Sequence, residues 1–94
     1  MLYNYNVNGR GITMRNIYAN VVKEIEEDYP RLYNDLMNMV NDSPLETTRD
    51  LMILKYAVDD KLETVYYRGM ISRIEREALG EYFEEIISEK FSQN

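Results

Sequence analysis

Residues 43–75, SPLETTRDLMILKYAVDDKLETVYYRGMISRIE, decide the fold, because they hold the strongest helix signals of the chain. Ser43 has the side chain of a helix N-cap, and Pro44 suits the first helical position because no backbone donor is needed there. Glu46 follows Ser43 by three residues and completes a capping box. We therefore predict a helix that begins after Ser43 and ends near Arg68.

The apolar residues of this stretch recur at the spacing of one helix face. They are Leu51, Leu54, Val58, Leu62 and Val65. In the first half, further apolar residues widen the stripe nearly all round: Met52, Ile53, Tyr56 and Ala57. We therefore expect the first half of this helix to be the most buried element of the protein. The letters LMILKYAV also fit a strand, but the capping signal upstream favours a helix.

A tight connection leads to a second long helix. Gly69 can adopt the left-handed backbone that ends a helix, and Ser72 with Glu75 forms another capping box. The next helix, over about 73–91, has a broad apolar face: Ile74, Ala78, Leu79, Tyr82, Phe83, Ile86, Ile87 and Phe91. Because the connection is short, this helix is expected to run antiparallel to the preceding one.

Two helical segments precede Ser43. Apolar periodicity predicts one helix over about 15–28 and a shorter one that ends near Asn41. Pro30 lies between them, and the residue before a proline avoids helical geometry. The sequence leaves open whether 15–41 is two helices or one kinked helix. The fold class is mainly α, a four-helix domain of two helical hairpins that forms a helical body over 15–91.

The first sixteen residues, MLYNYNVNGRGITMRN, differ from the rest because they hold two arginines and no acid. Asn8-Gly9 is a strong signal for a two-residue β-turn. Such a turn places these side chains on one side of a ribbon: Tyr3, Tyr5, Val7, Arg10, Ile12 and Met14. We predict a short N-terminal β-hairpin at 2–14, docked on the helices or on a partner. The alternative is a flexible extension ahead of Met14.

Size and composition fit one domain over residues 1–94, with 45% hydrophobic and 30% charged residues. No apolar run is long enough to cross a bilayer, and no signal peptide is recognised, so we expect a cytoplasmic protein that contacts no membrane. The net charge is −6, and residues 1–16 contribute +2 to it, so residues 17–94 carry −8. Such a body repels nucleic-acid phosphates and attracts basic surfaces.

The chain contains neither cysteine nor histidine. This excludes thiolate nucleophiles, disulfides, and the sites in which histidine serves as general base or metal ligand. Only paired carboxylates or an oxygen-ligated cation site remain, and no Asp-x-Asp-x-Asp-Gly calcium loop is present. We therefore expect a protein that is not an enzyme and that has no cofactor and no metal.

Acidic clusters are the most prominent polar feature. Carboxylates follow one another at helical spacing on the last helix: Glu77, Glu81, Glu84, Glu85 and Glu89. Two further clusters precede them: Asp59, Asp60 and Glu63, and, nearer the N-terminus, Glu24, Glu26, Glu27 and Asp28. They fit a carboxylate array that mimics the phosphates of a nucleic acid. The alternative is a solvated helix face.

Nine tyrosines accompany these carboxylates in a chain without tryptophan. Tyrosine is a frequent interface anchor, and we expect exposure of Tyr3, Tyr5, Tyr33 and Tyr67. The candidates for partner binding among them are Tyr3, Tyr5 and Tyr67. Other tyrosines lie on or beside the apolar stripes and are expected at the core or its edge: Tyr56, Tyr66 and Tyr82. An AT-rich genome would also raise the tyrosine and asparagine content, without any functional purpose.

Residues 49–72, RDLMILKYAVDDKLETVYYRGMIS, resemble the helix-turn-helix region of sigma-factor-type regulators. The matching residues are Arg49, Leu54, Lys55, Tyr56, Leu62, Glu63, Val65 and Ser72. The resemblance implies a DNA-binding transcriptional regulator whose helix after Ser72 reads bases. The chain departs from that pattern at Tyr66, where the family has a small residue, and at Gly69, which lies one place early. The helix after Ser72 also carries mostly acidic side chains, which oppose the phosphate field.

The leading hypothesis is a small acidic protein-binding module that engages a basic, nucleic-acid-binding surface of a host protein and touches no nucleic acid itself. Its composition is similar to that of small phage or mobile-element inhibitors, including anti-CRISPR and DNA-mimicking proteins. The alternatives are the helix-turn-helix regulator and a self-assembly module, in which the hairpin pairs edge to edge in a homodimer.

Overall fold

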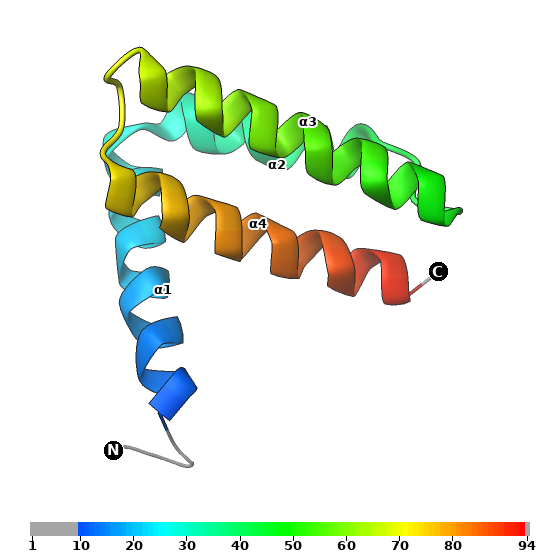
Figure 1. Cartoon of the computed structure of the whole chain (residues 1–94), viewed down its shortest axis with the longest axis horizontal. Coiled ribbons are helices and arrows are strands. Elements are labelled where there is room, and N and C mark those ends of the chain that lie inside the picture. Colours follow the sequence, from blue (N-terminus) through cyan, green and yellow to red (C-terminus); the bar gives the residue numbers. More distant parts are fainter. Residues whose placement is uncertain (1–9, 94) are drawn as a thin grey trace.

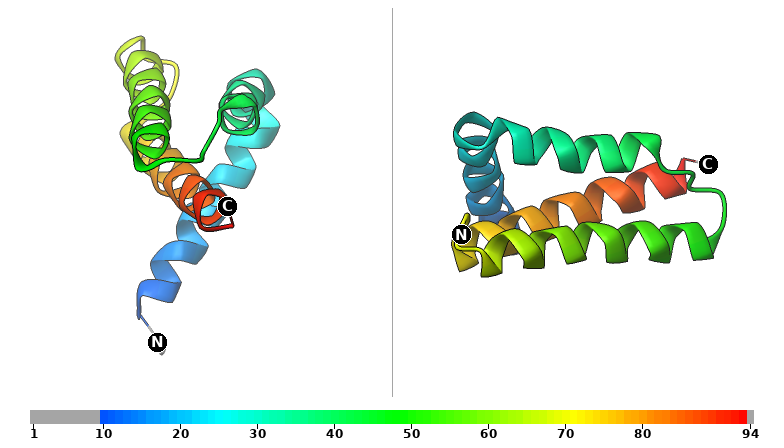
Figure 2. Two further views of the ribbon diagram at one scale, coloured as in Figure 1. Left: turned by 90° about the vertical axis from the view of Figure 1, so that its right-hand side faces the viewer. Right: turned by 90° about the horizontal axis from the view of Figure 1, so that it is seen from above.

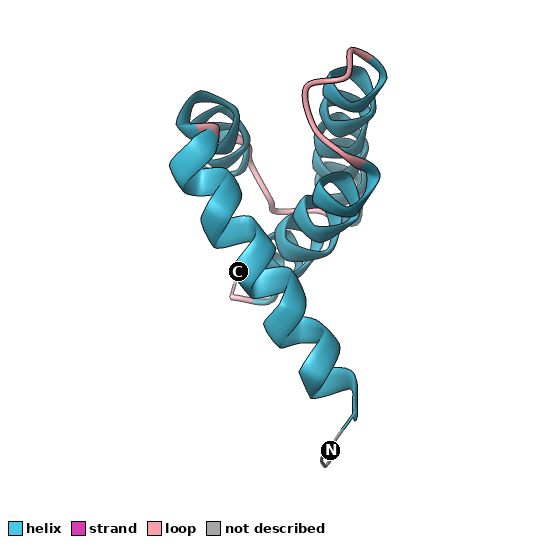
Figure 3. Ribbon diagram, turned by 90° about the vertical axis from the view of Figure 1, so that its left-hand side faces the viewer, coloured by secondary structure: helices cyan, strands magenta, loops and turns pink. Residues whose placement is uncertain are grey.

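The computed structural model describes residues 10–93, and the side chains of residues 18–93, as four helices joined by short loops (Figures 1 and 3). The helices are α1 (Arg10–Asp28), α2 (Pro30–Asp42), α3 (Thr48–Tyr67) and α4 (Arg73–Ser92). No strand occurs in this described part, so the mainly helical prediction is confirmed. Helix α1 begins at Arg10, earlier than the predicted start near residue 15.

The predicted hairpin at 2–14 has its first strand and its turn in residues 1–9, which lie outside the described residues. Residues 10–14, predicted as its second strand, fall within α1. Tyr3 and Tyr5, two of the predicted partner-binding residues, lie outside the described residues as well. Because its first strand and turn are not described, the hairpin as a whole stays a prediction.

Pro30 separates two helices, which answers the question that the sequence left open. Tyr29 has a non-helical backbone, with φ −131° and ψ 60°, and Pro30 takes the first position of α2. In Figure 1, α1 runs vertically and α2 horizontally, so the two form a corner and not the helical hairpin expected from the sequence. Helices α3 and α4 run antiparallel, as predicted.

The start of α3 differs from the prediction. Thr47 is the N-cap: its hydroxyl accepts a hydrogen bond from the Asp50 amide at 3.1 Å, and the Asp50 carboxylate accepts one from the Thr47 amide at 3.2 Å. Ser43 instead follows the end of α2 and donates to the Met39 carbonyl at 2.6 Å. The predicted cap at Ser43 is therefore wrong. Thr47-x-x-Asp50 is a second capping pattern in the same stretch. Leu45, which lies in the loop between Ser43 at the end of α2 and Thr47 at the start of α3, is buried in the core.

The connection between α3 and α4 follows the sequence prediction. Gly69 has φ +77°, and the amides of Gly69 and Met70 donate to the carbonyls of Tyr66 and Val65, which closes the end of α3. Ser72 accepts from the Glu75 amide at 3.2 Å, while the Glu75 carboxylate accepts from the Ser72 amide at 2.7 Å. These hydrogen bonds close the end of α3 and begin α4 within a few residues, so that α4 runs back along α3.

The core lies where α4 meets the other three helices. Figure 2 shows α4 along the line on which α2 and α3 converge, and α1 crosses it. Each helix supplies at least one side chain with almost no exposure: Ile25, Leu36, Leu62 and Phe83. The predicted stripe of α3 is confirmed, with Leu54, Val58, Leu62 and Val65 buried and Leu51 partly buried. Side chains from all four helices therefore share one core.

Contacts between α2 and α4 complete this packing. The Tyr33 and Tyr82 hydroxyl oxygens lie 3.1 Å apart, and the Tyr33 ring lies 5.8 Å from that of Phe83. The Lys90 ammonium donates to the Val40 carbonyl at 2.5 Å, in the last turn of α2. A cation at that position satisfies a carbonyl without a helical partner and complements the helix dipole.

The expectation that the first half of α3 is the most buried element is wrong. Met52 is 65% exposed, Ile53 58% and Tyr56 77%. Helix α3 packs on α2 and α4 with one side only, so the stripe of Leu54, Val58 and Leu62 already fills the interior and the opposite side faces solvent. Ile74 of the predicted α4 face is also exposed, at 58%.

A search of residues 10–93 for a membrane-spanning segment found none, because each helix in this range is too short or too polar.

Candidate partner-binding surface

One side of α3 presents large apolar side chains to solvent. Met52, Ile53 and Tyr56 are one residue and one helical turn apart, so they share a face, which we call the α3 patch. Tyr67, three to four turns further along, is 77% exposed and packs its ring 5.4 Å from that of Tyr66. Single exposed apolar residues are ordinary, whereas a contiguous group of them marks a contact surface.

A groove between α3 and α4 adjoins the α3 patch. It encloses about 330 Å³, and its lining includes Met52, Tyr56, Leu62, Gly80, Glu84 and Ile87. Leu62 and Ile87 are buried, so they form its apolar floor. Three charged side chains also line this α3–α4 groove: Lys55, Asp59 and Glu84. The Lys55 ammonium lies 3.9 Å from the Glu84 carboxylate, at the limit of an ion pair.

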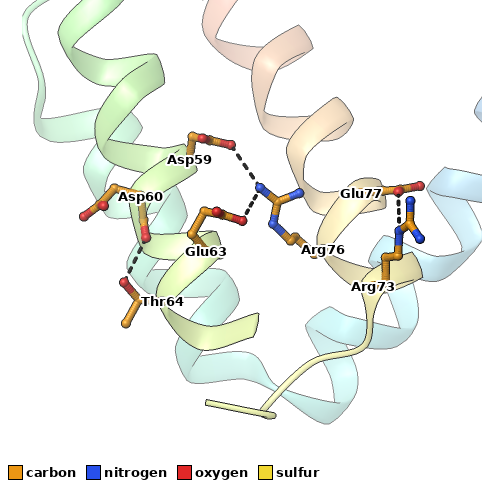
Figure 4. A network of polar contacts seen from close by, with 7 residues as sticks. All are labelled: Asp59, Asp60, Glu63, Thr64, Arg73, Arg76 and Glu77. Carbon is orange, nitrogen blue, oxygen red and sulfur yellow. Dashed lines mark hydrogen bonds and ion pairs between the residues drawn. The ribbon is translucent and has the colours of Figure 1, made fainter. Parts of the chain in front are cut away.

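The three predicted carboxylates of α3, Asp59, Asp60 and Glu63, differ from one another in their surroundings. The Arg76 guanidinium of α4 lies 2.5 Å from the Glu63 carboxylate and 3.7 Å from that of Asp59, and over the Tyr66 ring at 5.9 Å (Figure 4). The Asp60 side chain points away from Arg76 in this view and is exposed. Glu63 and Asp59 thus help to join α3 to α4, while Asp60 presents its charge to solvent beside the α3 patch.

The predicted glutamate row of α4 is divided between two sides of the helix. Glu77 pairs with Arg73 at 3.3 Å and, with Glu81 and Glu84, lines a hollow shared with Asp59 of α3 and Tyr18 of α1. The fold thus brings carboxylates from two predicted clusters to one place. Glu85 and Glu89 are exposed but line neither this hollow nor the α3–α4 groove.

The cluster near the N-terminus lies at the end of α1, and none of its four carboxylates lines the groove or the hollow. Glu26 instead interacts electrostatically with Tyr33 of α2. Burial raises the pKa of the Tyr33 phenol first of all, and the hydrogen bond to Tyr82 and the negative charge of Glu26 raise it further. This cluster is therefore not a part of the α3–α4 surface.

The sequence interpretation missed the side chains that give this surface its apolar character, Met52, Ile53 and Tyr56, because it assigned them to the core. One signal could have identified them. A chain of 94 residues has too little interior to surround a helix on all sides, so a helix that is apolar nearly all round must expose part of its surface. Gly80 was also missed, since its surroundings depend on how α3 and α4 pack.

No group of three acidic side chains that could hold a metal ion was found among the described residues. Comparison of the chain with protein-family models, with curated proteins and with solved structures gave no match.

Proposed function

We propose that this chain is a non-enzymatic protein-binding module that engages a basic surface of a partner protein through α3 and the adjoining side of α4. The observation that carries the proposal is the α3 patch, whose apolar side chains stand beside the carboxylates of Asp59, Asp60 and Glu84. Protein interfaces typically have an apolar centre rich in aromatic and methionine side chains, surrounded by a polar rim.

The charge of the molecule supports a basic partner. Residues 17–94 carry a net charge of −8, which steers cationic surfaces toward the module and repels acidic ones. Asp60 and Glu81 are exposed, and the single cation beside Glu84 is 3.9 Å away. Arg76 lies 3.7 Å from Asp59, so part of the negative charge around the α3 patch is neutralised within the chain, while the exposed Asp60 and Glu81 face solvent.

We further propose that the partner surface is one that otherwise holds nucleic acid, so that the module acts as an inhibitor. Carboxylates from α3 and α4 gather around one hollow, where they can take the place of phosphates. This role is the one expected from the compositional similarity to anti-CRISPR and DNA-mimicking inhibitors of phages and mobile elements. The geometry does not favour the helix-turn-helix alternative, which needs two helices at 90–120°, because α3 and α4 run antiparallel (Figure 1).

Capture of partners on the immobilised full chain, followed by mass spectrometry, tests the proposal. The site variant carries three exposed carboxylate changes, Asp60→Asn, Glu81→Gln and Glu84→Gln. The control variant changes the net charge equally at a distance from the α3–α4 surface, with Glu24→Gln, Glu27→Gln and Asp42→Asn. We expect a basic protein that the wild-type chain and the control retain at low salt, and that the site variant loses.

The salt dependence provides the second criterion. Raising NaCl from about 0.05 M to about 0.5 M shortens the screening length severalfold, so the captured protein is expected to elute. Added nucleic acid should compete for the same partner. Capture that both variants retain equally, or that salt does not weaken, would contradict the proposed function. Failure of nucleic acid to compete would overturn the inhibitor role alone.

A further inference from the structure

We infer that the α3–α4 groove receives one large apolar side chain of a basic amphipathic helix, with lysines or arginines of that helix meeting Asp59 and Glu84. This inference rests on the proposed protein-binding function, and it names the mode of recognition. The groove lies between two long antiparallel helices, which is the setting in which an amphipathic helix docks by inserting anchoring side chains.

Gly80 provides the observation that the fold alone does not explain. Glycine weakens a helix interior relative to alanine, and it is retained there when another segment approaches closely or when the backbone needs a positive φ. A Cβ atom added at Gly80 would meet its nearest neighbour, Leu62 Cδ1, at 4.0 Å, an ordinary contact distance. Among the described glycines only Gly69 has a positive φ. Internal packing therefore leaves room for a methyl group at Gly80.

Because glycine has no side chain, Gly80 leaves one wall of the α3–α4 groove open. Gly80 of α4 lines the same groove as Met52 and Tyr56 of α3, and the buried Leu62 and Ile87 form its floor. A cavity of about 150 Å³ is large enough for a benzene ring. The α3–α4 groove, at about 330 Å³, therefore accommodates a leucine, methionine or phenylalanine side chain.

The charges around the groove select the occupant. Asp59 and Glu84 line it from opposite helices, so a cationic side chain within one turn of the apolar anchor can reach one or both. Lys55 offers Glu84 a long contact of 3.9 Å, and Arg76 offers Asp59 one of 3.7 Å, so a cation that comes closer can replace either. A second copy of this chain fits less well, because two bodies of net charge −8 repel each other.

Fluorescence anisotropy with two synthetic peptides tests the inference on the full chain. The first is a labelled helix of about 18 residues of leucine and lysine, with all leucines on one face. The second has the same composition with its leucines scattered around the helix. At low salt, the amphipathic peptide is expected to bind the wild-type chain about tenfold more tightly than the scattered one, because only it aligns an apolar anchor with flanking cations.

Variants of the groove then separate this mode from general charge attraction. Gly80→Leu fills the groove and should weaken binding of the amphipathic peptide by about tenfold or more without lowering the thermal midpoint. Asn38→Leu, which adds the same side chain to an exposed position of α2, is its control. Met52→Ala should also weaken binding, whereas Met70→Ala, a change at an exposed methionine outside the groove, should not.

The outcomes distinguish failure of the inference from failure of the proposed function. If the amphipathic peptide binds the wild-type chain, and Gly80→Leu and Met52→Ala bind it equally well, the groove is not its site and only the inference is overturned. If neither cationic peptide binds at low salt, the proposed affinity for basic surfaces is overturned as well. A homodimer in light scattering that Gly80→Leu dissociates would place a second copy in the groove and would also overturn the inference.

Discussion

Tyr33 joins α2 to α4 through its hydroxyl group, and the same contact determines how this group titrates. Burial, the hydrogen bond to Tyr82 and the nearby Glu26 all raise the pKa of Tyr33 above its ordinary value. The neutral phenol is thus the form that the folded state favours. Its contribution to stability is fully present below the unfolded pKa of about 10 and is lost as the pH rises above that value toward the folded pKa.

An alkaline titration tests this residue. The ultraviolet absorbance of tyrosinate should include a late phase from Tyr33, which should coincide with alkaline unfolding. Tyr33→Phe should remove this late phase, whereas Tyr67→Phe, a change at an exposed position, should leave it in place. A late phase that persists in Tyr33→Phe would show that another tyrosine is the one protected.

Phe83 and Tyr56 provide a second comparison between single residues. Phe83 is completely buried, so Phe83→Ala is expected to lower the free energy of unfolding by about 3–5 kcal/mol. Tyr56 is 77% exposed, so Tyr56→Ala should change it by no more than about 0.5 kcal/mol. Urea denaturation measures both. If Tyr56→Ala proved as costly as Phe83→Ala, its ring would serve the fold and could not be reserved for a partner.

At the scale of the element, substitutions near the start of α3 distinguish two capping patterns that lie next to each other in the sequence, one at Ser43 and one at Thr47. Thr47→Ala removes the hydroxyl that accepts from the Asp50 amide, and it should cost about 1 kcal/mol. Ser43→Ala should cost less, because its hydroxyl donates to one carbonyl at the end of α2. Thr48→Ala, within the first turn, is a control. Chemical denaturation that ranked Ser43→Ala as the costlier change would restore the helix start predicted from sequence.

Substitution by alanine should change the stability with opposite signs at Gly69, at the end of α3, and at Gly80, in the middle of α4. Gly69→Ala forces a side chain into a left-handed backbone with φ +77°, which costs roughly 1–2 kcal/mol. Gly80→Ala places a methyl group at an ordinary distance from Leu62 and should raise stability by about 0.5–1 kcal/mol. Thermal denaturation of the two variants tests this. A destabilising Gly80→Ala would mean that α3 and α4 do require a glycine there, and it would remove the argument for an open groove.

The helices themselves were largely predictable, because their signals are local. Gly69 and the Ser72–Glu75 capping box define the connection between α3 and α4, and the stripe from Leu54 to Val65 is buried as its spacing predicts. Helical segments before and after Pro30 followed from the same kind of local geometry, whereas their separation into α1 and α2 was left open. Their corner arrangement did not follow from this geometry, since it depends on which faces pack against α4.

At the scale of the whole molecule, net charge opposes self-association. The chain has a mass of 11.2 kDa and a net charge of −6, and we expect light scattering at low salt to find a single chain. Removing residues 1–9, which precede α1, should leave the protein a single chain. A dimer that the truncation dissociates would instead support the self-assembly alternative, in which the N-terminal segment joins two copies.

The candidate surface was only partly predictable. The sequence identified Asp59, Asp60, Glu81 and Glu84 as candidates, but their gathering beside Met52 and Tyr56 follows from the packing of α3 on α4. The same packing assigns Glu63 to an ion pair with Arg76 and places Glu85 and Glu89 outside the groove. Carboxylates that look equivalent along a helix thus acquire different roles.

The sequence by itself determined the mainly helical fold, the connection of α3 to α4 through Gly69 and the Ser72 cap, and the stripe by which α3 is buried. These features depend on hydrogen bonds and side-chain spacing within a few residues. Only the tertiary structure decided which apolar side chains of α3 stay in contact with water and which carboxylates come together. Burial is a property of the whole domain, and α3 has neighbours on one side alone, so Met52, Ile53 and Tyr56 remain outside the core.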